Sequence, residues 1–237
     1  MKSRTALITG AGQGIGEAIA LALAQGGYDI GLHYRSSESK AQALAKRIRT
    51  LGRQVVLLRG DLTRPEEARG VVLGAEEALS GLDVLINNVG NYLYKPVLET
   101  SAEEWNEILA SNLSSTFYTC QAVIPLMRGR NHGRIVNLGY AGAQHLLARP
   151  GIVPYAIAKA GVLVLGRSLA KTEVAYGISI NTVAPGVIEN SVTQPKKEIP
   201  AGRVGAFQEV TDAVMYFVEA SAYVTGQVIE VAGGWNL

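Results

Sequence analysis

Short apolar runs of strand length alternate with longer amphipathic segments along the whole chain. Most of these runs are apolar at nearly every position, which is typical of strands that helices cover on both faces of a parallel sheet. The runs occupy residues 5–9, 28–34, 54–59, 83–87, 134–138, 178–183 and 227–231. The segments between them repeat apolar residues every three to four positions, as helices do, most clearly over residues 14–25, 38–51 and 65–79. The pattern predicts a single α/β domain over residues 1–237, with a doubly wound parallel sheet of about seven strands and helices on both faces.

Composition and charge exclude several classes of protein. The chain has 237 residues, 48% of them hydrophobic and 18% charged, which excludes an intrinsically disordered protein. The one cysteine, Cys120, cannot form an internal disulfide, and its apolar helical stretch favours a core position. A formal net charge of +2 gives no strong bias toward nucleic acid or an anionic membrane. The first apolar run stops at Thr9, too short for a signal peptide or a membrane span, so we expect a cytoplasmic protein without a membrane partner.

The first apolar run leads into a glycine-rich turn, and 27 of the 237 residues are glycine. In a parallel sheet, ligands bind at the carboxyl ends of the strands, so this turn is a candidate site. Glycines let the backbone approach a pyrophosphate, and the following helix offers free N–H groups and a partial positive charge. The alternative is a tight turn with close helix packing and no ligand. The residues of the turn that we expect to contact a dinucleotide are Gly10, Gln13, Gly14, Ile15 and Gly16.

The second apolar run ends at Tyr34, and Arg35 and Ser36 follow it. An unphosphorylated adenosine ribose would call for an acidic residue here, to accept from the 2′-hydroxyl. A guanidinium followed by hydroxyl groups suits a 2′-phosphate instead, so the sequence favours NADPH/NADP+ over NAD. The alternative is that Arg35 is a solvated surface residue. Arg4 and Lys40 are weaker candidates to assist at the same phosphate.

Polar residues also follow the third and fourth runs. Asp61 could accept from an adenine amino group or cap the next helix, and Leu62 beside it is expected to line the same site. Asn88 and Gly90 follow the fourth run and suit contacts with adenosine and with neighbouring backbone. The three histidines are too scattered in sequence to form a metal site, so no metal is expected.

A tyrosine and a lysine lie four residues apart at the start of a helical segment. Residues at this spacing share a helix face, so the ammonium of Lys159 would lie near the hydroxyl of Tyr155. A nearby ammonium favours the phenolate and should lower the tyrosine pKa from its usual value near 10. Tyr155 would then be a general acid for carbonyl reduction and a base for alcohol oxidation. Taken alone, such a pair is more often a surface pair.

Asn112 interrupts an otherwise helical stretch over residues 102–127. Asparagine is unfavourable inside a helix because its amide competes for backbone hydrogen bonds. The simple interpretation is a capped break between two helices.

Together, these residues resemble the short-chain dehydrogenase/reductase family, and most closely its 3-oxoacyl-carrier-protein reductases. The resemblance covers essentially the whole chain. It implies a Rossmann-type domain, a nicotinamide cofactor, hydride transfer at a carbonyl carbon and a homo-oligomer, either a tetramer or a dimer. It also implies a small carbonyl substrate, either an oxoacyl compound, a ketone or a pterin-like molecule. The motifs that carry the resemblance are Thr9-Gly10-x3-Gly14-x-Gly16, Gly60-Asp61, Asn87-Asn88-x-Gly90, Asn112, Tyr155-x3-Lys159 and Asn181-x2-Ala184-Pro185-Gly186.

The resemblance also assigns roles to individual positions. Lys159 would hold the nicotinamide ribose as well as act on Tyr155, and Asn112 would mark a helix kink and a water relay toward the lysine. Pro185, Gly186 and a backbone amide near Ile188 would lie at the nicotinamide, with a short lid after them.

The chain departs from the family pattern at Gly139 and Tyr140, where a serine usually donates a hydrogen bond to the substrate carbonyl. Losing one such donor typically lowers the rate by about 10²–10³. Three interpretations remain open. Tyr140 could supply the donor, or Gln144 or His145 could replace it. The third is that carbonyl chemistry is weak or absent and the protein is an NADP(H)-binding or regulatory module.

Overall fold

Within the residues that the structure describes, 3–192, 194 and 196–235, seven parallel strands form one sheet in the order β3-β2-β1-β4-β5-β6-β7. This computed structural model confirms the predicted doubly wound sheet, and no strand end lies more than two residues from the predicted one. The strands are β1 (Arg4–Ile8), β2 (Tyr28–Tyr34), β3 (Val55–Arg59), β4 (Val84–Asn87), β5 (Gly133–Leu138), β6 (Ile178–Pro185) and β7 (Val228–Val231).

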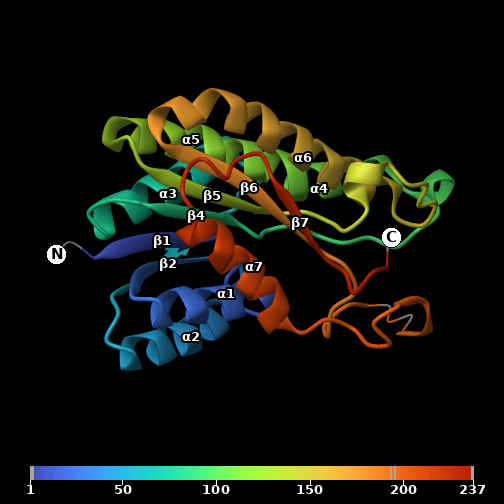
Figure 1. The fold of residues 1–237 in the computed structure, drawn as a ribbon, viewed down its shortest axis with the longest axis horizontal. Helices are drawn as coiled ribbons and strands as arrows, with labels where there is room; N and C mark the ends of the chain where they lie inside the picture. The colour runs from blue at the N-terminus through green and yellow to red at the C-terminus, as the bar shows by residue number, and fades with distance from the viewer. Residues whose placement is uncertain (1–2, 193, 195, 236–237) are drawn as a thin grey trace.

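Helices cover both faces of the sheet (Figure 1). One face carries α1 (Gly14–Gln25), α2 (Glu38–Thr50) and α7 (Phe207–Glu219), which share one apolar cluster with the strands. The other face carries α3 (Pro65–Ala78), α5 (Ser115–Arg130) and α6 (Val153–Glu173), with a second cluster. The helix α4 (Ala102–Leu109) joins α5 through a π-helical turn, η2 (Ala110–Ser114). Asn112 lies in this turn, so the predicted interruption is a change of helix type rather than a loop.

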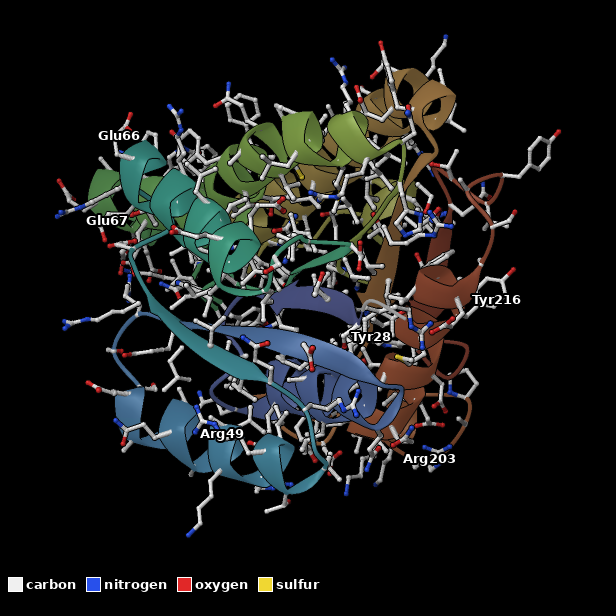
Figure 2. All side chains as sticks on the ribbon, turned by 90° about the vertical axis from the view of Figure 1, so that its left-hand side faces the viewer. Tyr28, Arg49, Glu66, Glu67, Arg203 and Tyr216 are labelled. Carbon is white, nitrogen blue, oxygen red and sulfur yellow. The ribbon has the colours of Figure 1, made fainter. Side chains whose placement is uncertain are left out.

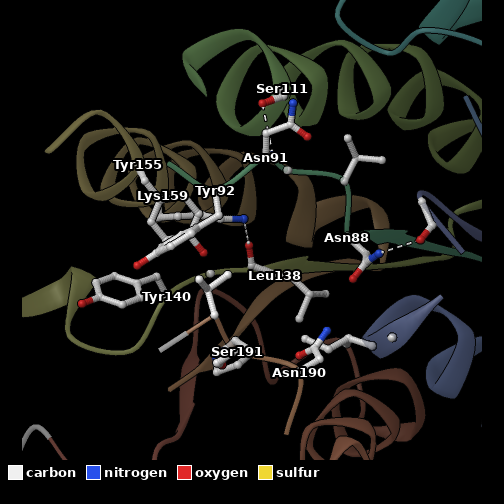
Figure 3. Close-up of a pocket in the computed structure, with 18 of the residues that line it drawn as sticks. Asn88, Asn91, Tyr92, Ser111, Leu138, Tyr140, Tyr155, Lys159, Asn190 and Ser191 are labelled. Atoms are coloured by element: carbon white, nitrogen blue, oxygen red, sulfur yellow. Dashed lines mark hydrogen bonds between the residues drawn. The ribbon is translucent and has the colours of Figure 1, made fainter. Parts of the chain in front are cut away.

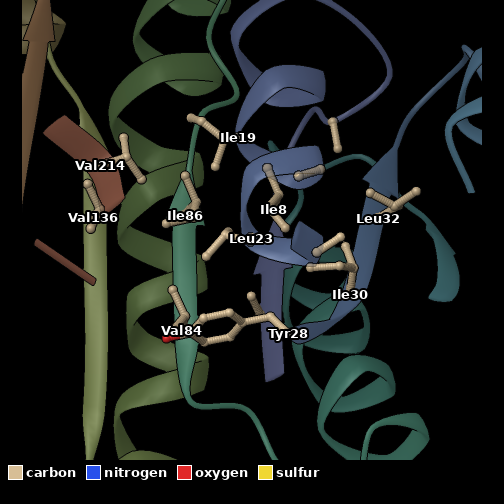
Figure 4. Packing of buried hydrophobic residues seen from close by; sticks show 14 of the residues in the cluster. Ile8, Ile19, Leu23, Tyr28, Ile30, Leu32, Val84, Ile86, Val136 and Val214 are labelled. Atoms are coloured by element: carbon tan, nitrogen blue, oxygen red, sulfur yellow. The ribbon is translucent and has the colours of Figure 1, made fainter. Parts of the chain in front are cut away.

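The core shows why apolar residues fill both sides of the strands. Ile8 and Ile86 pack toward α1, against Ile19 and Leu23 (Figure 4). Leu7, the neighbour of Ile8, packs into the second cluster on the other face. Because both faces of the central strands are buried, most successive positions of these strands are apolar. Cys120 also lies in the second cluster, where burial raises its pKa to about 12, as expected for a core cysteine.

Local sequence signals set several helix starts. Pro65 stands at the first position of α3, followed by Glu66 and Glu67, which favour the positive end of a helix. Figure 2 shows both glutamates on the outer side of α3, whereas Arg49 of α2 donates to the carbonyl oxygen of Val55 at the start of β3 (3.3 Å). Ser101 and Glu104 form a reciprocal capping box at the start of α4.

The helix α7 is not among the elements predicted from the sequence. Its buried residues Val210, Val214, Phe217 and Val218 have helical spacing, so the periodic pattern could have found it. It packs against α1 and closes the sheet face that carries the glycine-rich turn.

By length and composition alone, one helix of the described chain, Val153–Tyr176, could cross a membrane. It packs along β6, and its buried side includes Lys159 and Glu173. These contacts place it in the helical layer over one face of the sheet.

Candidate functional site

A cavity of about 1100 Å³ lies at the carboxyl ends of the strands, where the strand order reverses between β1 and β4. This switch point is where open α/β sheets bind their ligands. Gly16 and Asn112 lie behind the cavity wall. The predicted site residues that line the cavity are Gly10, Gln13, Gly14, Ile15, Tyr34, Arg35, Ser36, Asp61, Leu62, Asn88, Gly90, Tyr140, Tyr155, Lys159, Pro185, Gly186 and Ile188.

The cavity has two chemically different ends (Figure 3). Asn88 and Asn190 lie at one end, beside the glycine-rich turn. Tyr92, Tyr140 and Tyr155 gather at the other. We call these the glycine end and the tyrosine end.

At the glycine end, the backbone makes a cradle that only glycine allows. Gly10 and Gly14 adopt left-handed φ angles of +63° and +61°. A Cβ on Gly16 would lie 2.6 Å from the carbonyl oxygen of Gly10, so the helix start packs directly on the turn. The side-chain oxygen of the N-cap residue, Gln13, accepts a hydrogen bond from Lys40. The first N–H groups of α1 therefore suit an anion.

Two side chains hold this turn in place. Asn88 Nδ2 donates to the carbonyl oxygens of Thr9 (3.0 Å) and Gly10 (3.1 Å). The Gly10 N–H donates to Nδ1 of His33 (3.1 Å), while Nε2 of the same ring lies 3.0 Å from the Gly60 carbonyl oxygen. The backbone partners thus require a neutral His33 with its proton on Nε2. Sequence reasoning missed this role of His33, whose only signal is a polar residue inside an apolar run.

This arrangement predicts a stability loss in mild acid. Burial lowers the pKa of His33 below its usual 6.5, with Asp61 opposing and Arg35 reinforcing the shift. The unfolded chain therefore binds a proton more readily, and the free energy of unfolding should fall as pH drops below about 6.5. Urea unfolding between pH 7.5 and pH 5 measures it, and H33N should show a shallower dependence. Equal slopes for the two proteins would contradict the assignment.

Only some of the side chains expected at a 2′-phosphate lie near one another at the glycine end. Arg35 is 56% exposed, with Nη1 3.9 Å from Oδ2 of Asp61. Lys40 bonds Gln13 close by, but Arg4 pairs with Glu219 at the opposite end of the sheet and has no part in this site.

The alternative that Asp61 caps the next helix is wrong. The N-cap residue of α3 is Arg64, whereas Asp61 Oδ1 accepts from the backbone N–H (3.0 Å) and the hydroxyl (2.8 Å) of Thr63. These bonds hold the pKa of Asp61 below its usual value in spite of partial burial.

At the tyrosine end, α6 places Tyr155 and Lys159 side by side. Lys159 Nζ donates to the carbonyl oxygen of Leu138 (2.7 Å) and lies 5.7 Å from the centre of the Tyr155 ring. Burial lowers the pKa of Lys159 to about 8. The expected lowering of the Tyr155 pKa is wrong for this structure, because burial raises it, and Tyr92 and Tyr140 add to the effect. Like any tyrosine whose pKa is not lowered, Tyr155 keeps its hydroxyl proton at neutral pH and can donate it.

Asn112 lies next to the tyrosine end, outside the cavity lining. Its Nδ2 donates to the carbonyl oxygens of Asn91 (2.8 Å) and Ile108 (3.0 Å). Its buried Oδ1 has no hydrogen-bond partner among the described residues. A Cβ on Gly90 would overlap this oxygen and lie 3.4 Å from Lys159 Nζ. Because Gly90 has no side chain, a gap remains between the Asn112 amide and Lys159. The unpartnered oxygen of Asn112 could accept a hydrogen bond from a water molecule there.

Of the two positions where the family resemblance implies a serine, Gly139 and Tyr140, only Tyr140 has a side chain. A Cβ on Gly139 would lie 2.8 Å from Thr182 Cγ2, so a side chain there would press against β6. Tyr140 faces the cavity, with its ring centre 5.7 Å from that of Tyr155. Gln144 and His145 contact Glu230 instead, and neither lines the described cavity, so the expectation that one of them replaces the serine is not supported.

The segment after β6 closes the floor of the cavity. The Ile188 N–H, expected at the nicotinamide, donates to Ser191 Oγ (3.0 Å). Asn190 approaches the glycine-rich turn, because a Cβ on Gly14 would lie 3.0 Å from its Nδ2. Residues 193 and 195 of the predicted short lid lie outside the described residues.

Comparisons with known proteins show which family the chain belongs to. A family model described as "Enoyl-(Acyl carrier protein) reductase" matches residues 10–236. The 3-oxoacyl-[acyl-carrier-protein] reductase FabG of Escherichia coli (strain K12) is 34% identical, covering 98% of this chain and 97% of that protein. FabG of Vibrio cholerae serotype O1 is also 34% identical, covering 99% of this chain and 98% of its own. The crystal structure of acetoin dehydrogenase YohF from Salmonella typhimurium superposes with a TM-score of 0.88 at 28% identity, covering 98% of this chain and 96% of that one. The chain therefore belongs to the short-chain dehydrogenase/reductase family.

Proposed function

We propose that the protein is an NADPH-dependent carbonyl reductase, able to act in reverse as an alcohol dehydrogenase, with Tyr155 as its proton donor. Family membership makes it an oxidoreductase acting on carbonyl or alcohol groups. One observation carries the proposal: the partly buried Tyr155 stands beside Lys159 in a cavity that continues to the glycine-rich turn.

The residues at the glycine end fit a nicotinamide dinucleotide. Gly10, Gly14 and the start of α1 form a backbone cradle for the pyrophosphate, and Arg35 and Ser36 suit a 2′-phosphate. When bound, NADPH would supply a hydride to a carbonyl carbon.

The chain's own residues then handle the proton. Tyr155 donates it to the carbonyl oxygen, and the Lys159 ammonium stabilises the phenolate that remains. The side-chain oxygen of Asn112 lies next to Gly90 on the side that faces Lys159. This oxygen has no partner among the described residues and could hold a water molecule that returns a proton to the phenolate. Tyr140 replaces the serine as a hydrogen-bond donor to the same carbonyl oxygen.

A second candidate function is an NADP(H)-binding module with weak or no catalysis. It is favoured by the hydrogen bond between Tyr140 and Arg149, which engages the hydroxyl that would serve the substrate. In that case the cofactor would bind normally and no carbonyl compound would be reduced.

A panel of carbonyl compounds with NADPH distinguishes the two functions. Wild type is expected to oxidise NADPH with at least one compound, and Y140F to lower that rate by about 10²–10³, the usual effect of losing one donor. Y140S should restore part of it. A wild type without turnover, together with a Y140S variant that gains it, would establish the binding module instead.

Replacing Arg35 tests the cofactor preference. A charge-assisted hydrogen bond contributes about 1.5–3 kcal/mol, so R35A should raise the Kd for NADPH about 10–100-fold. The Kd for NADH should stay unchanged, since that cofactor has no 2′-phosphate. Fluorescence titration with both cofactors measures the effect, and K46A, an exposed lysine on α2, is the control. Equal affinity of wild type for NADPH and NADH would refute the assignment.

The proposal includes a small carbonyl substrate, cytoplasmic location and a homo-oligomer, either a tetramer or a dimer. Light scattering on the purified chain measures the oligomeric state directly.

A further inference from the structure

One carboxylate contacts the turn that carries Tyr140 and has no part in the proposed proton transfer. Glu230 belongs to β7, where it stands opposite Ala184 of β6. Its side chain is 18% exposed, and Glu230 is not among the described residues that line the cavity. In the sheet, β6 separates β7 from β5 (Figure 1). To contact a turn that follows β5, the Glu230 side chain must therefore cross β6.

The turn after β5 donates a backbone hydrogen bond to this carboxylate. The Ala143 N–H donates to the Tyr140 carbonyl oxygen (3.0 Å), which closes a four-residue turn. Such a turn does not use the N–H of its third residue, Gly142, whose φ of +90° favours glycine. This N–H donates instead to Oε1 of Glu230 (2.9 Å). A hydrogen bond to an ionised acceptor is roughly twice as strong as one between neutral groups, so this contact should fix the turn.

Two side chains just after the turn approach the same carboxylate oxygen. Gln144 Nε2 donates to Oε1 of Glu230 (3.2 Å), and His145 Nε2 lies 3.9 Å from it. Glu230 thus holds the segment after β5 at the backbone of Gly142 and again at the side chain of Gln144.

Tyr140 stands between two residues that β6 holds. The N–H groups of Gly139 and Ala141 donate to carbonyl oxygens of β6, at 2.7 and 3.0 Å. The Tyr140 ring lines the cavity, with its centre 5.7 Å from that of Tyr155 (Figure 3). Because β6 fixes the start of the turn and Glu230 fixes its far side, the direction of the Tyr140 side chain depends on both.

We propose that Glu230 is a positioning residue, which binds the Gly142 N–H and so fixes the turn that directs the Tyr140 hydroxyl toward the substrate carbonyl. The inference rests on the proposed function, in which Tyr140 replaces the serine as a donor. A misplacement of about 1 Å can lower a rate about 10²-fold, so the position of one turn can decide whether its donor works. Glu230 needs no contact with substrate or cofactor for this effect.

Replacing Glu230 by leucine and by glutamine tests the proposal in the full-length protein. E230L removes the acceptor and should lower kcat for the best compound of the panel about 10–100-fold. E230Q keeps an oxygen that can accept from Gly142, and should retain most of the wild-type kcat. Both variants should bind NADPH with a Kd close to that of wild type. E77L, the same change at an exposed glutamate of α3, is the matched control and should keep full activity.

A double-mutant cycle distinguishes the positioning of Tyr140 from a general loss of structure. If Glu230 acts through Tyr140, adding E230L to Y140F should lower kcat by less than about twofold. A merely structural role would lower the kcat of Y140F by the same factor as that of wild type, and this result would overturn the proposal. An E230L protein with the kcat of wild type would overturn it too. So would an E230Q as slow as E230L, since its acceptor oxygen is still present.

Hydrogen exchange followed by mass spectrometry tests the contact without turnover. The peptide over residues 139–146 should exchange faster in E230L than in wild type, and at the wild-type rate in E77L. Turnover by wild type with an unchanged kcat in E230L would refute this inference alone. A wild type that reduces no compound of the panel would refute the proposed function, and the exchange rate would then decide alone whether Glu230 holds the turn. An E230L peptide that exchanges at the wild-type rate would show that it does not.

Discussion

Y155F is expected to lower kcat for carbonyl reduction by about 10²–10⁴-fold, the range attributed to a positioned general acid. The substitution removes one oxygen and keeps the ring that packs against Tyr92 and Tyr140. The hydroxyl of Tyr155 is the proton source in the proposed mechanism, and a tyrosine hydroxyl carries its proton at neutral pH. Steady-state NADPH oxidation with the best compound of the panel measures the effect.

The same variant should bind NADPH as tightly as wild type, because the lost oxygen serves the substrate carbonyl. Y223F is the matched control: it makes the same chemical change at a side chain that is 94% exposed, and it should retain full activity. If Y155F kept a wild-type kcat, Tyr155 would not be the proton donor.

G90A is expected to damage both stability and catalysis. Its Cβ would overlap Asn112 Oδ1 and lie 2.9 Å from the Cγ of the same side chain. Overpacking of this kind destabilises by about 1–3 kcal/mol, and in a chain of this length each kcal/mol lowers Tm by about 2–4 °C. Since the displaced amide faces Lys159, kcat should also fall, by about 10²-fold for a shift on the order of 1 Å.

Gly70 supplies the control for this substitution. It lies inside α3, and a Cβ there would meet nothing within 4 Å. G70A should therefore raise the free energy of unfolding by about 0.5–1 kcal/mol and leave kcat unchanged, because alanine is the better helix residue. A G90A protein with wild-type Tm and kcat would show that the position of the Asn112 side chain does not depend on the space left by Gly90.

Much of this fold could be predicted because burial on both faces makes most strand positions apolar. That pattern is local, and so are the glycine spacing and the four-residue separation of Tyr155 and Lys159. The position of Arg35 after β2 is equally local, and the structure does place it at the cavity.

The contacts that sequence reasoning could not find depend on residues far apart in the chain. His33 holds Gly10 and Gly60 only because β1, β2 and β3 are neighbours in the sheet. The pKa of Tyr155 was predicted in the wrong direction because a charge four residues away is visible in sequence, whereas burial is not.

The central claim is that this chain transfers a hydride from NADPH to a carbonyl carbon with Tyr155 as proton donor. The most direct measurement uses NADPH deuterated at C4 of the nicotinamide ring and mass spectrometry of the alcohol product. Wild type should place one deuterium on the carbinol carbon, and Y155F should give almost none in the same time. A wild type that binds NADPH and yields no deuterated alcohol from any carbonyl compound of the panel would contradict the account.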